Sequence, residues 1–138
     1  MASRLPLLKT KLQRPRVLRN VVPRPHLWEM LDRGSDKSLT LVCAGAGFGK
    51  STLVSSWVEH TATLNPAGVP QPAAWLSLDE HDSDPHVFLQ YVIAALRTVA
   101  ADACEETLSL LQSPQQPRRD RLFTTLINEI VLLPSRIV

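Results

Sequence analysis

The chain has 138 residues, 44% of them hydrophobic and 20% charged, which fits one globular domain or part of one and argues against disorder throughout. It has no run of about 18 apolar residues and no apolar stretch after Met1, so neither a membrane span nor a secretory signal is predicted. Its two cysteines form no disulfide framework, so we predict a cytoplasmic protein.

Basic residues are concentrated at the start of the chain. Residues 1–28 carry seven of the 15 lysines and arginines and no acid. A basic arm of this kind can contact nucleic acid or an anionic surface. Prolines at positions 6, 15, 23 and 25 interrupt any helix that would gather these charges on one face. We therefore predict a solvated, Pro-interrupted leader over residues 1–25 and place the folded part in residues 26–138.

The first half of the folded part predicts a helix, a strand and a second helix. Residues 26–33 carry apolar side chains at helical spacing. Residues 38–44 (SLTLVCA) form a short apolar run that is typical of a strand buried on both faces, with Cys43 as a small buried residue. A glycine-rich loop follows, and helical spacing returns over residues 50–60.

The second half continues the alternation. Asp84 is a good helix N-cap, and Pro85 suits the first helical position. Strands that alternate with helices predict an α/β fold with a parallel sheet. We predict connectors at residues 65–72 and 113–120, and a strand at residues 73–79. We also predict a capped helix at residues 84–99, a further helix at 122–131 and the start of a third strand at 135–138.

The loop at residues 44–51 reads A-G-A-G-F-G-K-S, close to the phosphate-loop signature G-x-x-x-x-G-K-[ST] with alanine at the first glycine. Backbone N–H groups can wrap a phosphate where side chains are small, and the following helix aims its N-terminus at the anion. A dinucleotide fingerprint would need G-x-G-x-x-G, which this loop lacks. The residues expected to contact ATP or ADP are Ala44, Gly45, Ala46, Gly47, Phe48, Gly49, Lys50, Ser51 and Thr52.

Three of these residues have predicted roles of their own. Lys50 is expected to reach the β- and γ-phosphates, and Ser51 to offer its hydroxyl to Mg²⁺. Thr52 is expected to contact the α-phosphate. The alternative is a glycine-rich turn with an exposed lysine.

Acidic residues near the second predicted strand are weaker candidates. Asp79 and Glu80 end that strand, where ligands of open α/β sheets bind, so either could face the nucleotide or its metal-bound water. The alternative is a polar strand end. The histidines and aspartates of residues 81–86 could also be drawn as a metal cluster, but a turn of this composition is usually solvated.

Four stretches, LLKTKLQRPR, VVPRPHLWEML, LTLVCAGAGFGKSTLVSSW and AAWLSLDEHDSDPHVFLQYVIAAL, carry a family resemblance. In this order and spacing they resemble the N-terminal part of the MalT-like, large ATP-binding LuxR-type transcription regulators, which are STAND-class P-loop ATPases. The resemblance implies a slow ATPase switch: ADP holds a resting form, and an inducer with ATP favours a self-associating form. It also implies that DNA is bound only through a C-terminal helix-turn-helix, and that Arg24 lies beside the nucleotide.

The chain departs from this family at its end. The resemblance places a strand with paired aspartates (Walker B) next, but the sequence ends at residue 138. We therefore expect an incomplete P-loop NTPase sheet with flanking helices, cut before the Walker B strand and inactive in hydrolysis by itself. In the strand order 5-1-4-3-2 of that fold, the first two strands are not neighbours, so we also expect marginal stability.

Two other functions stay open. One is a fragment of a small-molecule kinase or other P-loop NTPase, which would need a substrate lid and a catalytic acid. The other is an interaction fragment that does not bind nucleotide. Replacing Lys50 with alanine separates the ATP-binding switch from the interaction fragment. It should abolish nucleotide binding in the first case and change nothing in the second.

Overall fold

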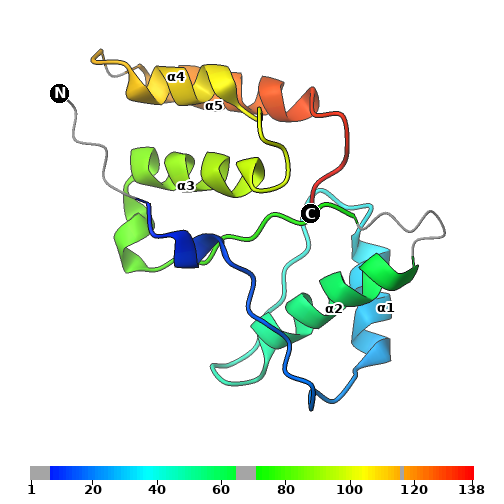
Figure 1. Ribbon diagram of the computed structural model, residues 1–138. Coiled ribbons are helices and arrows are strands. Elements are labelled where there is room, and N and C mark those ends of the chain that lie inside the picture. Colours follow the sequence, from blue (N-terminus) through cyan, green and yellow to red (C-terminus); the bar gives the residue numbers. More distant parts are fainter. Residues whose placement is uncertain (1–6, 65–70, 116) are drawn as a thin grey trace. The chain divides into compact units, whose positions relative to one another are not determined.

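The computed structural model describes residues 7–64, 71–115 and 117–138 (Figure 1). The chain divides into two compact units. The first takes the described residues of Met1–Gln13 and Pro72–Ile137, and the second takes those of Arg14–Gln71 with Val138. No helix among the described residues has the length and apolar character needed to span a bilayer.

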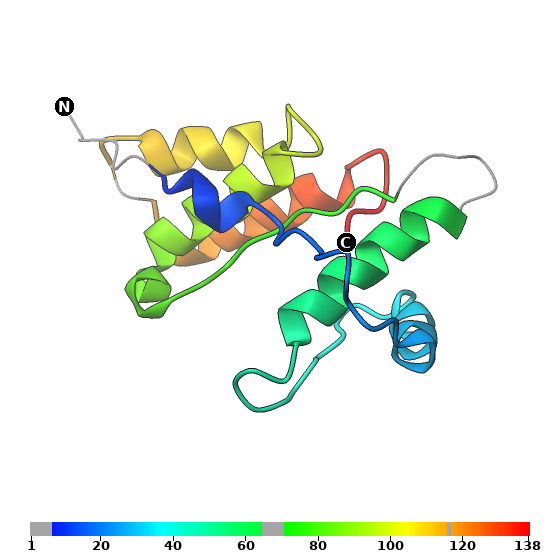
Figure 2. The same ribbon diagram turned by 60° about the horizontal axis from the view of Figure 1, so that its bottom comes forward.

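The first unit is built on three α-helices that pack together in both views (Figures 1 and 2). They are α3 (Pro85–Arg97), α4 (Glu105–Gln112) and α5 (Arg119–Val131), and two short 3₁₀ helices, η1 (Lys9–Leu12) and η2 (Glu80–Ser83), lie against α3. The start of α3 follows the prediction, because the Asp84 side chain accepts hydrogen bonds from the backbone of His86 and Val87.

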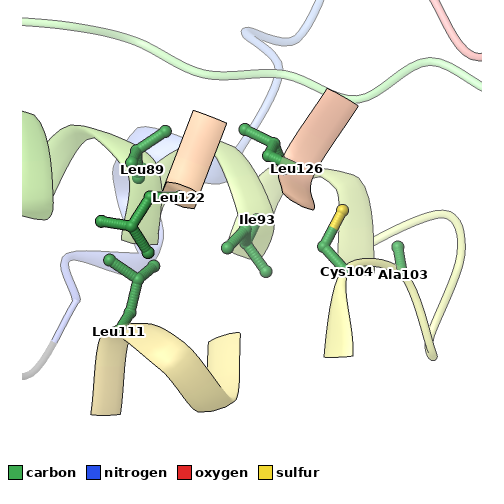
Figure 3. Close-up of a cluster of buried hydrophobic side chains, with 7 residues drawn as sticks. All are labelled: Leu89, Ile93, Ala103, Cys104, Leu111, Leu122 and Leu126. Atoms are coloured by element: carbon green, nitrogen blue, oxygen red, sulfur yellow. The ribbon is translucent and has the colours of Figure 1, made fainter. Parts of the chain in front are cut away.

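The core of this unit collects apolar side chains from all three helices and from the turn before α4. Figure 3 shows the cluster, in which Leu89 and Ile93 of α3 are each 1% exposed. Cys104, at the start of α4, is buried and has a positive φ of 58°. The cluster consists of Leu89, Ile93, Ala103, Cys104, Leu111, Leu122 and Leu126.

Helix α4 was not predicted from the sequence, and a distant residue completes its N-terminus. The Glu129 carboxylate, on α5, accepts hydrogen bonds from the backbone N–H groups of Glu106 and Thr107, both at 2.9 Å, and from the Thr107 hydroxyl. Burial raises the pKa of Glu129, but these hydrogen bonds outweigh it and hold the pKa below its ordinary value. The residue that caps α4 therefore lies on another helix.

Replacing Glu129 with alanine is expected to destabilise the first unit by about 1–2 kcal/mol, the usual cost of a lost helix cap. The buried Thr107 hydroxyl would also lose its partner. Urea unfolding followed by far-ultraviolet circular dichroism measures the change. Asp102→Ala, at an exposed turn position, is the matched control. Equal midpoints for both variants would contradict a capping role.

The second unit pairs α1 (Pro25–Gly34) with α2 (Lys50–Leu64), as both views show (Figures 1 and 2). The Trp57 indole donates a hydrogen bond to Asp32 at 2.6 Å. The Trp28 indole donates to the Ser56 hydroxyl at 3.2 Å, and its ring stacks on His60 at a centroid distance of 4.4 Å. Both helices were predicted from apolar spacing.

The prediction of an α/β parallel sheet is wrong for this structure. The described residues contain helices and no strand. Residues 38–44, expected to be buried on both faces, are irregular chain, with Leu39 and Leu41 81% and 79% exposed and Cys43 exposed. Residues 73–79 and 135–138, also predicted as strands, form no strand either. An apolar run becomes a strand only when a neighbour takes its N–H and C=O groups in a repeating pattern. Among the described residues the Ser77 N–H donates to the Lys11 carbonyl at 2.8 Å, but this single hydrogen bond does not make a strand.

Candidate phosphate-binding loop and adjoining hollow

The glycine loop lies in the second unit and leads directly into α2, which begins at Lys50. Gly47 and Gly49 have φ of 79° and 77°, in the left-handed region that favours glycine. A Cβ at either position would meet no atom within 4 Å, so backbone conformation and not space requires glycine there. Glycine at these positions therefore lets the chain turn sharply into the helix.

Lys50 folds back over the loop. Its ammonium donates hydrogen bonds to the backbone carbonyls of Ala44 and Gly45, both at 2.8 Å. The first turn of α2 carries no acidic side chain, and helix N-termini present N–H groups without intrahelical partners. This arrangement offers positive charge and backbone donors to an anion, which would compete with the two carbonyls for Lys50.

A hollow of about 180 Å³ adjoins the loop. It brings together three residues that were predicted at the site, Arg24, Gly49 and Thr52. The other lining residues are mostly apolar and were not predicted from the sequence. The two valines directly before Pro23 are the feature of the sequence that could have indicated an apolar wall here. These remaining lining residues are Val21, Val22, Leu53 and Ser56.

The other predicted loop residues do not line this hollow. Phe48 is 70% exposed, and its ring lies 3.1 Å from the position a Cβ on Gly45 would take. Ser51, the predicted Mg²⁺ ligand, is exposed on the first turn of α2. Among the described residues, no group of three His, Cys, Asp or Glu side chains is placed to hold a metal ion. The Mg²⁺ role of Ser51 stays a prediction.

Asp79 and Glu80 belong to the first unit, and the structure gives Asp79 a structural task. Its carboxylate lies 2.8 Å from the Lys11 ammonium and accepts the His81 backbone N–H at the start of η2. The hydrogen bond from Lys11, followed by the one from His81, lowers the pKa of Asp79. A carboxylate held ionised in this way is a weak general base. The catalytic role of these two acids stays a prediction.

Lys11 also binds Asp82, whose side chain is 4% exposed, through both carboxylate oxygens at 2.8 and 2.7 Å. The Lys11 hydrogen bond is the main cause that lowers the pKa of Asp82. The Lys11 ammonium lies 5.0 Å from the centre of the Tyr91 ring, and the Tyr91 hydroxyl accepts the Leu8 N–H at 3.1 Å. These contacts hold residues 8–11 against α3 and η2.

This ion-pair cluster predicts a loss of stability in acid. Asp79 and Asp82 have lower pKa values folded than unfolded, so they stabilise the fold above about pH 4, the ordinary range of a carboxylate. That contribution is lost as the pH falls through the folded pKa values. The urea midpoint should therefore fall between about pH 5 and pH 2. Lys11→Met should flatten this dependence; an unchanged slope in that variant would contradict the cluster's role.

Comparisons with known proteins add a family relationship. Over 124 residues, 90% of the chain, it is 36% identical to a protein named HTH-type transcriptional regulator MalT from Serratia proteamaculans (strain 568). Proteins of the same name from Yersinia pestis (strain Pestoides F) and Yersinia pseudotuberculosis serotype O:1b (strain IP 31758) are 33% identical over the same length. The chain is related to these MalT regulators.

The chain spans 13% of the length of these relatives. No protein-family model matches it, and no solved structure matches it. The relationship therefore supports a MalT-like chain, as the sequence motifs predicted.

Proposed function

We propose that this chain is the nucleotide-binding part of a MalT-like transcriptional regulator. In this proposal residues 44–52 hold the phosphates of ATP or ADP, and the adjoining hollow holds the base. The exchange of one nucleotide for the other acts as a conformational switch. The regulatory role is carried over from the relatives, which are named HTH-type transcriptional regulators.

The observation that carries the proposal is the joining of loop and hollow. Gly49 belongs to the phosphate-loop motif and Thr52 directly follows it, and both line the hollow. Arg24, from the segment before α1, also lines it. Valine and leucine side chains suit the flat face of a base, whereas backbone donors and cations suit phosphates. No parallel sheet carries this loop in the described residues, so the proposal rests on the loop and the hollow alone.

The residues have separable tasks in this proposal. Gly47 and Gly49 turn the backbone so that the start of α2 faces the phosphates. Lys50 exchanges its bonds to Ala44 and Gly45 for bonds to phosphate oxygens. Mg²⁺, when bound with the nucleotide, would neutralise phosphate charge, and Ser51 is the residue whose hydroxyl would hold it. DNA contact and self-association are proposed for a complete regulator.

An equilibrium titration with a fluorescent ATP analogue, with and without Mg²⁺, tests the proposal. We expect saturable binding that unlabelled ATP and ADP displace and that Mg²⁺ strengthens. Inorganic tripolyphosphate should displace the analogue more weakly, because it cannot fill the hollow. Absence of saturable binding by a chain with intact helical circular dichroism would overturn the proposal and favour an interaction fragment.

A further inference from the structure

One wall of the hollow comes from residues 14–24, which we call the wall segment. It contributes Val21, Val22 and Arg24, whereas α2 and the loop supply the rest of the lining. A hydrogen bond from the Val21 N–H to the Leu18 carbonyl, 3.2 Å long, gives the segment a turn of its own. Side-chain contacts at its two ends join it to α2.

The first end is fastened to the middle of α2. The Arg14 guanidinium donates a hydrogen bond to the Ser55 carbonyl at 2.5 Å and lies 3.4 Å from both the Ser55 hydroxyl and the Glu59 carboxylate. The Ser55 hydroxyl in turn donates to the carbonyl of Pro15 at 2.5 Å. Ser55 is 1% exposed, so its side of the contact is shielded from water, whereas the Arg14 side chain is 31% exposed.

The position of this contact on α2 ties it to the site. Ser55 and Glu59 are four residues apart and share one face of the helix. Ser56, the residue after Ser55, and Leu53, two residues before it, line the hollow. At the other end of the wall segment, Pro25 opens α1, where Trp28 donates to Ser56. Both ends of the wall are thus fixed to the helix that begins at the phosphate loop.

We infer that Arg14 and Ser55 are positioning residues for the nucleotide site. They hold the wall segment against α2 at the distance that the base requires and do not touch the ligand. The inference rests on the proposed function, because it assumes that the base occupies the hollow. It concerns only the base: the loop is built from residues 44–52 and does not depend on the wall.

Two ligands separate this role from general destabilisation. ATP uses both loop and hollow, whereas tripolyphosphate uses the loop alone. Arg14→Ala and Ser55→Ala are each expected to weaken ATP binding about tenfold, as the loss of a hydrogen bond to a charged or buried group does. Binding of tripolyphosphate should change by less than about twofold. Arg14→Lys, which keeps the charge but loses the fork, should restore part of the ATP affinity.

Two controls lie beside the contact. Arg16→Ala removes an exposed arginine two positions away, and Glu59→Gln removes only the partly exposed ion pair with Arg14. Both are expected to bind ATP like the wild type. Helix content of every variant is checked by circular dichroism.

Each outcome has a defined meaning. If the wild-type chain binds neither ligand, the proposed function fails. If it binds both with equal affinity, the base does not use the hollow and the inference fails. The inference also fails if Arg14→Ala and Ser55→Ala bind ATP normally, if they lose both ligands in equal measure, or if both variants unfold.

Discussion

Lys50→Ala is expected to weaken binding of the ATP analogue by about 10- to 100-fold, the effect of losing charge-assisted hydrogen bonds to phosphate. In the structure Lys50 is held 2.8 Å from two loop carbonyls, so its ammonium is already placed over the loop before a ligand arrives. Alanine at this position removes the cation and also frees those carbonyls. Tripolyphosphate should lose affinity to the same extent as ATP, because both rely on the loop.

Fluorescence titration of both ligands measures this prediction. Lys37→Ala is the matched control, since it removes an exposed lysine of the same unit and leaves the loop intact. Unchanged binding in Lys50→Ala would mean that the nucleotide, if bound, uses another surface. The pair of ligands makes Lys50 and Arg14 distinguishable: the first acts on phosphate, the second only on the base.

Ile93→Ala is expected to lower the free energy of unfolding of the first unit by about 2–5 kcal/mol, and Ile93→Val by about 0.5–1.5 kcal/mol. Ile93 is 1% exposed at the centre of the cluster in Figure 3, between residues of α5 and the turn before α4. Its truncation leaves a cavity that the surrounding helices fill only in part. A small unit has little stability to spare, so the alanine variant is expected to be largely unfolded.

Hydrogen exchange measured by mass spectrometry assigns this loss to a unit. Peptides from α3 and α5 should lose protection in Ile93→Ala, and peptides from α2 should change less. Ile127→Ala, on an α5 residue that is 59% exposed, should change stability by less than about 0.5 kcal/mol. Equal effects of the two alanine substitutions would contradict the assignment of the core.

Several apolar side chains of both units are exposed. Leu39 and Leu41 are exposed in the second unit, and Ile127, Val131 and Leu132 are exposed at the end of the first. Such exposure adds little to stability, because apolar groups stabilise a fold only when they leave water. The marginal stability expected from the sequence remains a prediction. A single cooperative unfolding transition with a strong near-ultraviolet signal would contradict it.

The sequence alone determined features whose hydrogen bonds are local. The helices α1, α2, α3 and α5 follow from apolar spacing, and the Asp84 cap needs partners only two and three residues away. The requirement for glycine in the loop is also local, because Gly47 and Gly49 each adopt a positive φ that other residues rarely take. These predictions needed no knowledge of distant residues.

Only the tertiary structure decided the features that depend on distant partners. A strand needs a neighbour, and an apolar run cannot reveal whether one is present, so residues 38–44 were predicted as a strand and are irregular chain. Helix α4 is capped by Glu129, 22 and 23 residues beyond the N–H groups it receives. The wall of the hollow is fixed by Arg14 and Ser55, 41 residues apart. Contacts at such separations carry no periodic signature in the sequence, because they are set by packing and not by spacing.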